Sequence, residues 1–322
     1  MSLAEEDCER VRPPLERRPY AFAVLFGEGH APPKLPHLLE HVRRWRPDVL
    51  VYETSDLASP VAAAAAGIPA VHHGFGTMPS HALLRFGAAT VAPLWRRQGL
   101  EPDPYAGAFT GLYVDVVPPC LDDADRPLGP STRIRLPVVA DGEAPRWLDE
   151  LAEPLVYVTL GTAFNHPHLF RPLVEALGGE PVAALVTTGR DVDPADLGPL
   201  PPNVRAERYV PQAHVLPRAA AVVTHGGSGT TLAALSLGRP LVVVPQGADQ
   251  FENAARYERV GVAVVVTPAD LGADAVRAAL RRVMSDAAYA AAARAVAEEF
   301  AELPSPDEVA ATVERHVGSS VR

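Results

Sequence analysis

Residues 222–254 read VVTHGGSGTTLAALSLGRPLVVVPQGADQFENA, and this stretch decides the fold class. Its β-branched run predicts a buried strand that ends at His225, and GGSGTT leads directly into a helix at about 229–238. Glycines let the backbone approach a ligand, and the N–H groups at the start of a helix attract anions. The stretch therefore predicts a strand–turn–helix unit with an anion site at the turn.

The side chains of the turn strengthen this prediction. The hydroxyls of Ser228, Thr230 and Thr231 supply further donors, so we expect a diphosphate there, with a plain tight turn as the alternative. A dinucleotide-binding fingerprint is excluded because the third glycine of GxGxxG is absent after GSG. A Walker loop is excluded because no lysine follows the glycines.

Strand and helix patterns alternate throughout the second half of the chain. Short β-branched runs predict strands at residues 155–160, 182–188, 220–225, 240–245 and 262–266. Helical patterns follow at 167–178, 229–238 and 249–260, and two or three alanine-rich helices lie between about 272 and 317. Apolar strands that alternate with helices favour a parallel sheet covered on both faces. We therefore expect a complete Rossmann-like unit.

The first half has fewer recognisable strands. The expected elements are strands within 46–53, 68–74 and 111–119 and helices within 55–67 and 78–98. Ser55 is a candidate cap for the first of these helices. A doubly wound domain usually has about six strands, so we expect the first strands of this half to be missing from this chain.

The two halves are joined by residues 127–147, which are rich in proline and small polar residues and lack a sustained period. This composition is typical of a linker. We place a first domain at residues 1–138, the linker at 139–150 and a second domain at 151–322.

Composition narrows the class of protein. The 322 residues suffice for two domains, and 48% hydrophobic with 21% charged residues is typical of a globular chain. The net charge of -10 argues against nucleic acid or a membrane as partner. Neither a signal-peptide core nor a membrane-spanning run is present, so we expect a cytosolic protein. Cys8 and Cys120 alone make neither a disulfide framework nor a zinc site, and we expect no metal.

Two further motifs add polar and aromatic groups near the predicted anion site. In YVPQ, residues 209–212, Tyr209 can lie against a nucleobase while the backbone of Val210 pairs with the base edge, and ordinary strand-end packing is the alternative. Asp249 and Gln250 begin a helix and suit hydrogen bonds to sugar hydroxyls, although Asp249 would also serve as a helix N-cap.

A fourth motif, TLGT at residues 159–162, ends the first strand of the second half. Together with YVPQ, HGGSGTT and PQGADQ, in this order, it resembles the nucleotide-sugar glycosyltransferases of the GT-B fold, and most of all actinobacterial enzymes that decorate natural products. The resemblance implies an α/β architecture in which two Rossmann-like domains face a cleft, the N-terminal one being incomplete here. The first domain would then bind an acceptor and the second a sugar nucleotide.

The resemblance also assigns individual residues. It places Tyr209 and Val210 at the base, Gln212 nearby, and Asp249 and Gln250 at the donor sugar. The residues it places on the diphosphate are Thr162, His225, Gly227, Ser228, Gly229 and Thr230.

The family's general base is a histidine that follows the first strand and is oriented by a carboxylate several strands later. Glu53, at the end of DVLVYE, matches that carboxylate, and a solvated strand-end glutamate is the alternative. His30 follows a glycine-rich segment but lies directly before the wrong strand, so we expect it in a connecting helix or loop. The base itself is expected to be absent from this chain. His72 and His73 are candidates for acceptor contacts or for structural roles.

The resemblance thus implies an inverting glycosyltransferase that needs neither metal nor cofactor beyond its sugar-nucleotide co-substrate. Its acceptor would be a hydroxyl of a hydrophobic small molecule, and a homodimer is left open. Ala233 stands where relatives that use uridine nucleotides carry a glutamate, which favours a thymidine diphosphate donor. The alternatives are a non-catalytic sugar-nucleotide-binding or partner protein and, with less support, a sugar-nucleotide epimerase.

Overall fold

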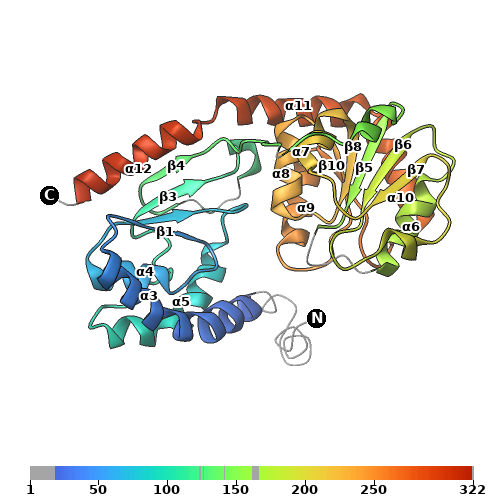
Figure 1. Cartoon of the computed structure of the whole chain (residues 1–322). Coiled ribbons are helices and arrows are strands. Elements are labelled where there is room, and N and C mark those ends of the chain that lie inside the picture. The colour runs from blue at the N-terminus through green and yellow to red at the C-terminus, as the bar shows by residue number, and fades with distance from the viewer. Residues whose placement is uncertain (1–18, 123–124, 126, 141, 162–166, 321–322) are drawn as a thin grey trace. The chain divides into compact units, whose positions relative to one another are not determined.

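The computed structural model describes residues 19–122, 125, 127–140, 142–161 and 167–320. The chain divides into two compact units, each with its own parallel sheet (Figure 1). The first unit takes residues 1–117, 122–135 and 304–322, and the second takes 118–121 and 136–303. The α/β fold with two parallel sheets agrees with the expected architecture.

The second unit is built on six parallel strands in the order β10-β9-β8-β5-β6-β7. Their bounds are β5 Leu155–Thr159, β6 Ala183–Thr187, β7 Val204–Glu207, β8 Ala219–Thr224, β9 Leu241–Val243 and β10 Ala263–Val265. The order reverses between β5 and β8, and in open α/β sheets ligands bind at such a switch point, beyond the carboxyl ends of the strands. The Rossmann-like unit is confirmed.

Helices cover both faces of this sheet, and the predicted helical segments are confirmed. The longer ones are α6 Pro167–Leu177, α8 Ser228–Ser236, α9 Gln250–Arg259, α10 Ala273–Ser285 and α11 Ala287–Glu302. The short ones are η2 Pro119–Leu121, η3 Arg146–Glu150, η4 Pro194–Leu197, α7 Gln212–Val215 and η5 Leu216–Arg218. The strands are buried because they are apolar on both sides, as Val156, Val186 and Val242 illustrate.

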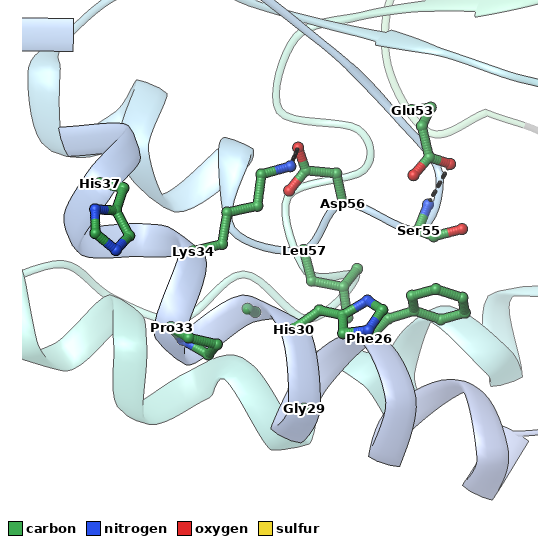
Figure 2. A pocket seen from close by; sticks show the side chains of 11 residues that line it. Phe26, Gly29, His30, Pro33, Lys34, His37, Glu53, Ser55, Asp56 and Leu57 are labelled. Carbon is green, nitrogen blue, oxygen red and sulfur yellow. Dashed lines mark hydrogen bonds and ion pairs between the residues drawn. The ribbon is translucent and has the colours of Figure 1, made fainter. Parts of the chain in front are cut away.

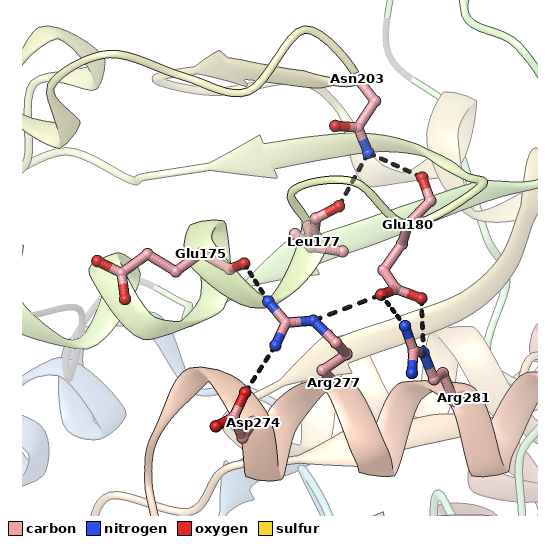
Figure 3. A network of polar contacts seen from close by, with 7 residues as sticks. All are labelled: Glu175, Leu177, Glu180, Asn203, Asp274, Arg277 and Arg281. Atoms are coloured by element: carbon pink, nitrogen blue, oxygen red, sulfur yellow. Dashed lines mark hydrogen bonds and ion pairs between the residues drawn. The ribbon is translucent and has the colours of Figure 1, made fainter.

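A polar network fastens α10 to the segment between α6 and β6 (Figure 3). The carboxylate of Glu180 accepts hydrogen bonds from Nε and Nη2 of Arg281, at 2.9 and 2.7 Å. Arg277 pairs with the same carboxylate at 3.4 Å and donates to the backbone oxygen of Glu175 at 2.8 Å. Because two guanidinium groups stabilise its charged form, the pKa of Glu180 lies below its usual value.

The first unit contains four parallel strands in chain order, where sequence predicted three. They are β1 Leu50–Glu53, β2 Ala70–His73, β3 Leu112–Asp115 and β4 Ser131–Arg133. The fourth lies inside the segment predicted as a linker, and Ser131 is paired with Tyr113 of β3. A three-residue strand with polar side chains has no hydrophobic signature, and its existence depends on the edge that β3 offers.

The helices of this unit are η1 Ala23–His30, α3 Ala31–Trp45, α4 Ser59–Ala66, α5 His81–Arg97 and α12 Pro306–Ser320. The prediction that Ser55 caps α4 is wrong. Ala58 stands at the N-cap position without a side-chain cap, and Oδ1 of Asp56 accepts the N–H groups of Ala58 and Ser59 at 3.2 Å each.

The glycine-rich segment before α3 is helical, not a turn. η1 is a π-helix that ends at His30 and continues directly into α3, so the expectation that His30 belongs to a connecting helix agrees with the structure. Gly27 has a packing function here: a Cβ atom at this position would overlap with Thr90 of α5. The glycine thus lets η1 lie against α5.

The C-terminal helix belongs to the first unit, although sequence assigned residues 151–322 to one domain. Val309 of α12 is buried against Val71 of β2 and Val114 of β3. Without α12, the apolar side chains on this face of the sheet would be exposed to water. Among the described residues, no helix is both long and apolar enough to cross a membrane.

Candidate active site

The N-terminus of α8 lies beyond the carboxyl end of β8, beside the switch point. Gly226 has a φ of +90°, which favours glycine, and Gly227 is the N-cap with φ -66° and ψ 141°. No side chain caps this helix. Within the described residues, the N–H groups at Gly229 and Thr230 have no hydrogen-bond acceptor, and Gly229 is exposed. These donors lie at the turn where the sequence predicts an anion site, and anion binding there stays a prediction.

The side chain of Thr231 does not contribute to this site. It is fully buried, and its hydroxyl lies 2.8 Å from both the backbone oxygen of Gly227 and the hydroxyl of Tyr257. The expectation that Thr231 offers a donor is therefore wrong. Ser228 is 6% exposed and Thr230 half-buried, so of the three predicted hydroxyls the one of Thr230 is the most accessible.

The imidazole of His225 is packed between two glycines. A Cβ atom on Gly161 would lie 2.6 Å from Cε1 of the ring, and one on Gly227 would overlap with it. Burial lowers the pKa of His225 to about 4, although the charge of Asp249 acts in the opposite direction. The ring is therefore neutral at pH 7 and has one N–H to donate to a phosphate oxygen.

Asp249 precedes α9 at the N-cap position but does not cap the helix with its side chain. Its Oδ2 instead accepts a hydrogen bond from Nδ2 of Asn253 at 2.9 Å and lies 3.4 Å from the hydroxyl of Ser228. The carboxylate is thus held beside the start of α8. Asn253 was not singled out in the sequence, where the i, i+4 spacing from Asp249 was the available signal.

Gln250 is 2% exposed. Its Oε1 accepts hydrogen bonds from the N–H groups of Gln246 and Gly247, at 2.7 and 3.2 Å. These bonds brace the loop between β9 and α9. The contact of Gln250 with a donor sugar stays a prediction.

The YVPQ motif lies where β7 ends and α7 begins. The ring of Tyr209 is 77% exposed, whereas Val210 is 3% exposed. An exposed aromatic ring that follows a strand can stack on a nucleobase. Gln212 is the first residue of α7 and is half-buried. Thr162 lies outside the described residues.

In the first unit, a cavity of about 470 Å³ lies at the end of β1 (Figure 2). Its lining includes apolar residues Phe26, Pro33 and Leu57 and polar residues His30, Lys34, Glu53 and Asp56. Glu53 is exposed, and its Oε2 accepts the N–H of Ser55 at 2.8 Å. Lys34 pairs with Asp56 at 2.6 Å. Although His30 lines the same cavity, no hydrogen bond joins it to Glu53.

His72 has a structural role. It is 2% exposed, and its two ring nitrogens lie 2.9 Å from the hydroxyl of Thr54 and 3.1 Å from the backbone oxygen of Ala108. Its ring stacks on Tyr52 with 5.1 Å between centroids, and burial lowers its pKa to about 4. His73 is half-buried, with Nδ1 2.7 Å from the backbone oxygen of Gly74. These contacts lie within the protein and involve no acceptor molecule.

No group of three or more histidine, cysteine, aspartate or glutamate side chains in the described part of the chain is arranged to hold a metal ion. A Rossmann-like unit with free N–H donors at its switch point, next in sequence to a second parallel-sheet unit, agrees with the GT-B architecture expected from the sequence.

Comparison with known proteins gives the family. The family model "Erythromycin biosynthesis protein CIII-like, N-terminal domain" matches residues 30–149, and the corresponding C-terminal domain model matches 175–315. L-demethylnoviosyl transferase of Streptomyces niveus is 36% identical over 288 residues, which cover 86% of this chain and 73% of that protein. The chain therefore belongs to the erythromycin biosynthesis protein CIII-like family of GT-B glycosyltransferases.

Solved structures of glycosyltransferases resemble this chain in fold. Glycosyltransferase VinC in complex with dTDP has a TM-score of 0.80 and 27% identity, covering 96% of this chain and 83% of that one. Spinosyn rhamnosyltransferase SpnG complexed with spinosyn aglycone has a TM-score of 0.83 and 26% identity, covering 96% and 84%.

Proposed function

We propose that this chain transfers a deoxysugar from a thymidine diphosphate donor to a hydroxyl of a hydrophobic natural product, with inversion at the anomeric carbon. The observation that carries the proposal is the uncapped N-terminus of α8 beside the neutral ring of His225. When the acceptor hydroxyl attacks the anomeric carbon, the bond to the diphosphate breaks and negative charge moves onto the leaving group. The N–H groups and dipole of α8 stabilise that charge.

The donor binds the second unit in this proposal. The diphosphate lies at Gly227, Ser228, Gly229 and Thr230, and the sugar lies near Asp249. The exposed ring of Tyr209 stacks on the base. VinC, a structural relative, is described in complex with dTDP, which supports a thymidine nucleotide.

The acceptor binds the first unit, at the cavity that Glu53 lines. Apolar walls formed by Phe26, Pro33 and Leu57 suit a hydrophobic molecule, and a carboxylate at the rim suits the orientation of a general base. SpnG is described in complex with an aglycone, which supports an acceptor of this chemical class.

A second candidate function, a non-catalytic sugar-nucleotide-binding protein, is favoured by one observation. Within the described residues, the carboxylate of Glu53 bonds the backbone of Ser55 and no histidine. Loss of a general base lowers the rate by about 10²–10⁴-fold. We therefore expect this 322-residue chain to bind donor nucleotide but to turn over acceptor slowly.

Calorimetry with dTDP, combined with product detection from a dTDP-sugar and a panel of hydrophobic acceptors, tests the proposal. Tight dTDP binding with slow transfer is the expected result. Absence of nucleotide binding would contradict both functions. Rapid transfer that His30→Ala abolishes would assign the base to His30 and contradict the expectation that this chain lacks a general base.

A further inference from the structure

Asn253 joins the two parts of the proposed donor site. It is fully buried on α9, and its Nδ2 lies 3.1 Å from the backbone oxygen of Gly226, 2.9 Å from Oδ2 of Asp249 and 3.4 Å from the hydroxyl of Ser228. Gly226 and Ser228 belong to the turn before α8, where the diphosphate is proposed to bind, and Asp249 supplies the carboxylate expected at the sugar. One amide group therefore connects the turn to the carboxylate.

The orientation of this amide is set by Arg256, which is 3% exposed on the same helix. Nη1 of Arg256 donates a hydrogen bond to Oδ1 of Asn253 at 3.1 Å. A guanidinium group has donors only, so the amide oxygen must face Arg256 and the amide N–H groups must face the site. A flipped amide would turn its oxygen toward the oxygen of Asp249.

The carboxylate of Asp249 depends on Asn253 more than the turn does. The turn has further support, because the N–H of Gly226 lies 3.4 Å from Oγ1 of Thr224 and the N–H of Thr231 bonds the oxygen of Gly227 at 3.2 Å. Asp249 makes no cap, and within the described part of the chain the other hydrogen bond of its carboxylate is the 3.4 Å one to Ser228. A bond to a charged carboxylate is also the stronger type.

We propose that Asn253 is a positioning residue that holds the carboxylate of Asp249 toward the donor sugar and thereby determines how much the sugar contributes to donor binding. This inference rests on the proposed function. It assigns Asn253 a role through Asp249, not a contact with the reacting atoms.

Asn253→Asp tests the inference because it preserves side-chain shape but replaces the donor with an acceptor. Calorimetry with dTDP and with dTDP-glucose gives two dissociation constants for the wild-type chain and for each variant. We expect the affinity for dTDP to change by less than about threefold and the affinity for dTDP-glucose to fall about tenfold or more. In an Asp249→Ala background, Asn253→Asp should change the ratio of the two constants no further.

Tyr257→Phe is the matched control. The hydroxyl of Tyr257 lies 2.8 Å from Oγ1 of Thr231, so this variant loosens the same pair of helices without removing a bond to Asp249. Its ratio of constants should equal that of the wild type, and thermal unfolding reports any loss of stability in both variants.

Two outcomes would overturn the inference. An Asn253→Asp variant with an unchanged ratio would show that Asn253 does not act on the sugar, whether both affinities fall together or neither does. A ratio that changes equally in Tyr257→Phe would reduce the effect to loosening of the helices. A wild-type chain that binds neither nucleotide would overturn the proposed function itself, and is distinguishable from both.

Discussion

The imidazole of His225 lies against Gly161 across the switch point of the six-stranded sheet, with Cε1 2.6 Å from the position that a Cβ atom would take on Gly161. The two residues follow the neighbouring strands β8 and β5. The glycine of TLGT therefore makes room for the histidine of HGGSGTT, and this contact links two motifs that are more than 60 residues apart.

Gly161→Ala should weaken dTDP binding about tenfold. The alanine methyl group would displace the ring, and the backbone φ of +75° would cost about 1 kcal/mol or more for a residue with a side chain. Calorimetry measures the affinity. Gly198→Ala is the control, because Gly198 has a similar φ of +73° but nothing within 4 Å of its Cβ position. Equal loss of affinity in both variants would contradict the contact with His225 as the cause.

His225→Ala and Thr230→Ala should each weaken dTDP binding without unfolding the protein. Each removes a hydrogen bond to a charged oxygen, worth about 1.5–3 kcal/mol, or about 10- to 150-fold in the dissociation constant. Ser236→Ala is the control, since that hydroxyl lies at the other end of α8 and bonds the backbone of Ala233. Unchanged affinity in both test variants would remove the start of α8 from the donor site.

The wild-type chain should bind dTDP more tightly than UDP. Ala233 lies on α8, eight residues after His225, where a glutamate would bond both ribose hydroxyls. A deoxyribose lacks one of them, so a glutamate with a missing partner would cost about 1–3 kcal/mol. Ala233→Glu should therefore shift the preference toward UDP in competition calorimetry, whereas Ala233→Gln, which has the same length but no charge, should shift it less. Tighter UDP binding by the wild type would refute this prediction.

Two histidines, one buried and one partly buried, should make the protein less stable in mild acid. His72 and His225 have pKa values of about 4 in the folded state, below the unfolded value of 6.5. The unfolded chain therefore binds more protons between pH 6.5 and 4, and stability is lost as pH falls through that window. From pH 7 to pH 5 the loss is about 2 kcal/mol per histidine.

Asp115 opposes this trend, because burial raises its pKa from 3.8 to about 6, and its contribution to stability is lost as pH rises through that range. Urea unfolding at pH 7 and pH 5 separates the groups. His72→Gln should reduce the difference in stability between the two pH values, whereas Asp115→Asn should enlarge it. An identical difference in wild type and His72→Gln would contradict the assignment.

Glu180→Gln should lower the free energy of unfolding of the second unit by about 1.5–3 kcal/mol, because the charge-assisted bonds to Arg281 and Arg277 are weakened inside the network of Figure 3. Denaturant titration measures the change. Glu175→Gln is the control: its exposed i,i+4 pair with Arg171 should contribute less than about 0.5 kcal/mol. Equal losses would show that burial of Glu180 does not matter.

Local patterns in the sequence were enough to predict the second unit. Strands such as β5 and β8 are short, apolar and rich in β-branched residues. Glycine turns lead from such strands into helices, so the hydrophobic period and the turn residues predict the same alternation of strand and helix. The turn at Gly226 and Gly227 was also predictable, because Gly226 adopts a positive φ that favours glycine. The order of motifs indicated the GT-B class, which the family comparison confirms.

Only the tertiary structure decided which side chains meet at that turn. Asn253 reaches Gly226 across 27 residues, and Gln250 is occupied by the loop before it. The i, i+4 spacing pointed at most to a bond between Asn253 and Asp249, whereas the bond to Gly226 depends on how α9 packs against the turn. The contact of Asp249 with the donor sugar and that of Tyr209 with the base stay predictions.

In the first unit, too, some elements followed from the sequence and others only from the tertiary structure. The sequence alone predicted β1, β2 and β3, because each contains apolar or aromatic residues within a longer run that reads as a strand. It did not determine β4, which is polar and exists through pairing with β3, or the docking of Val309 on the sheet nearly 200 residues earlier in the chain. Local propensity acts within a few residues, whereas strand pairing and helix docking are selected by the surface that remains to be buried once the strands have formed.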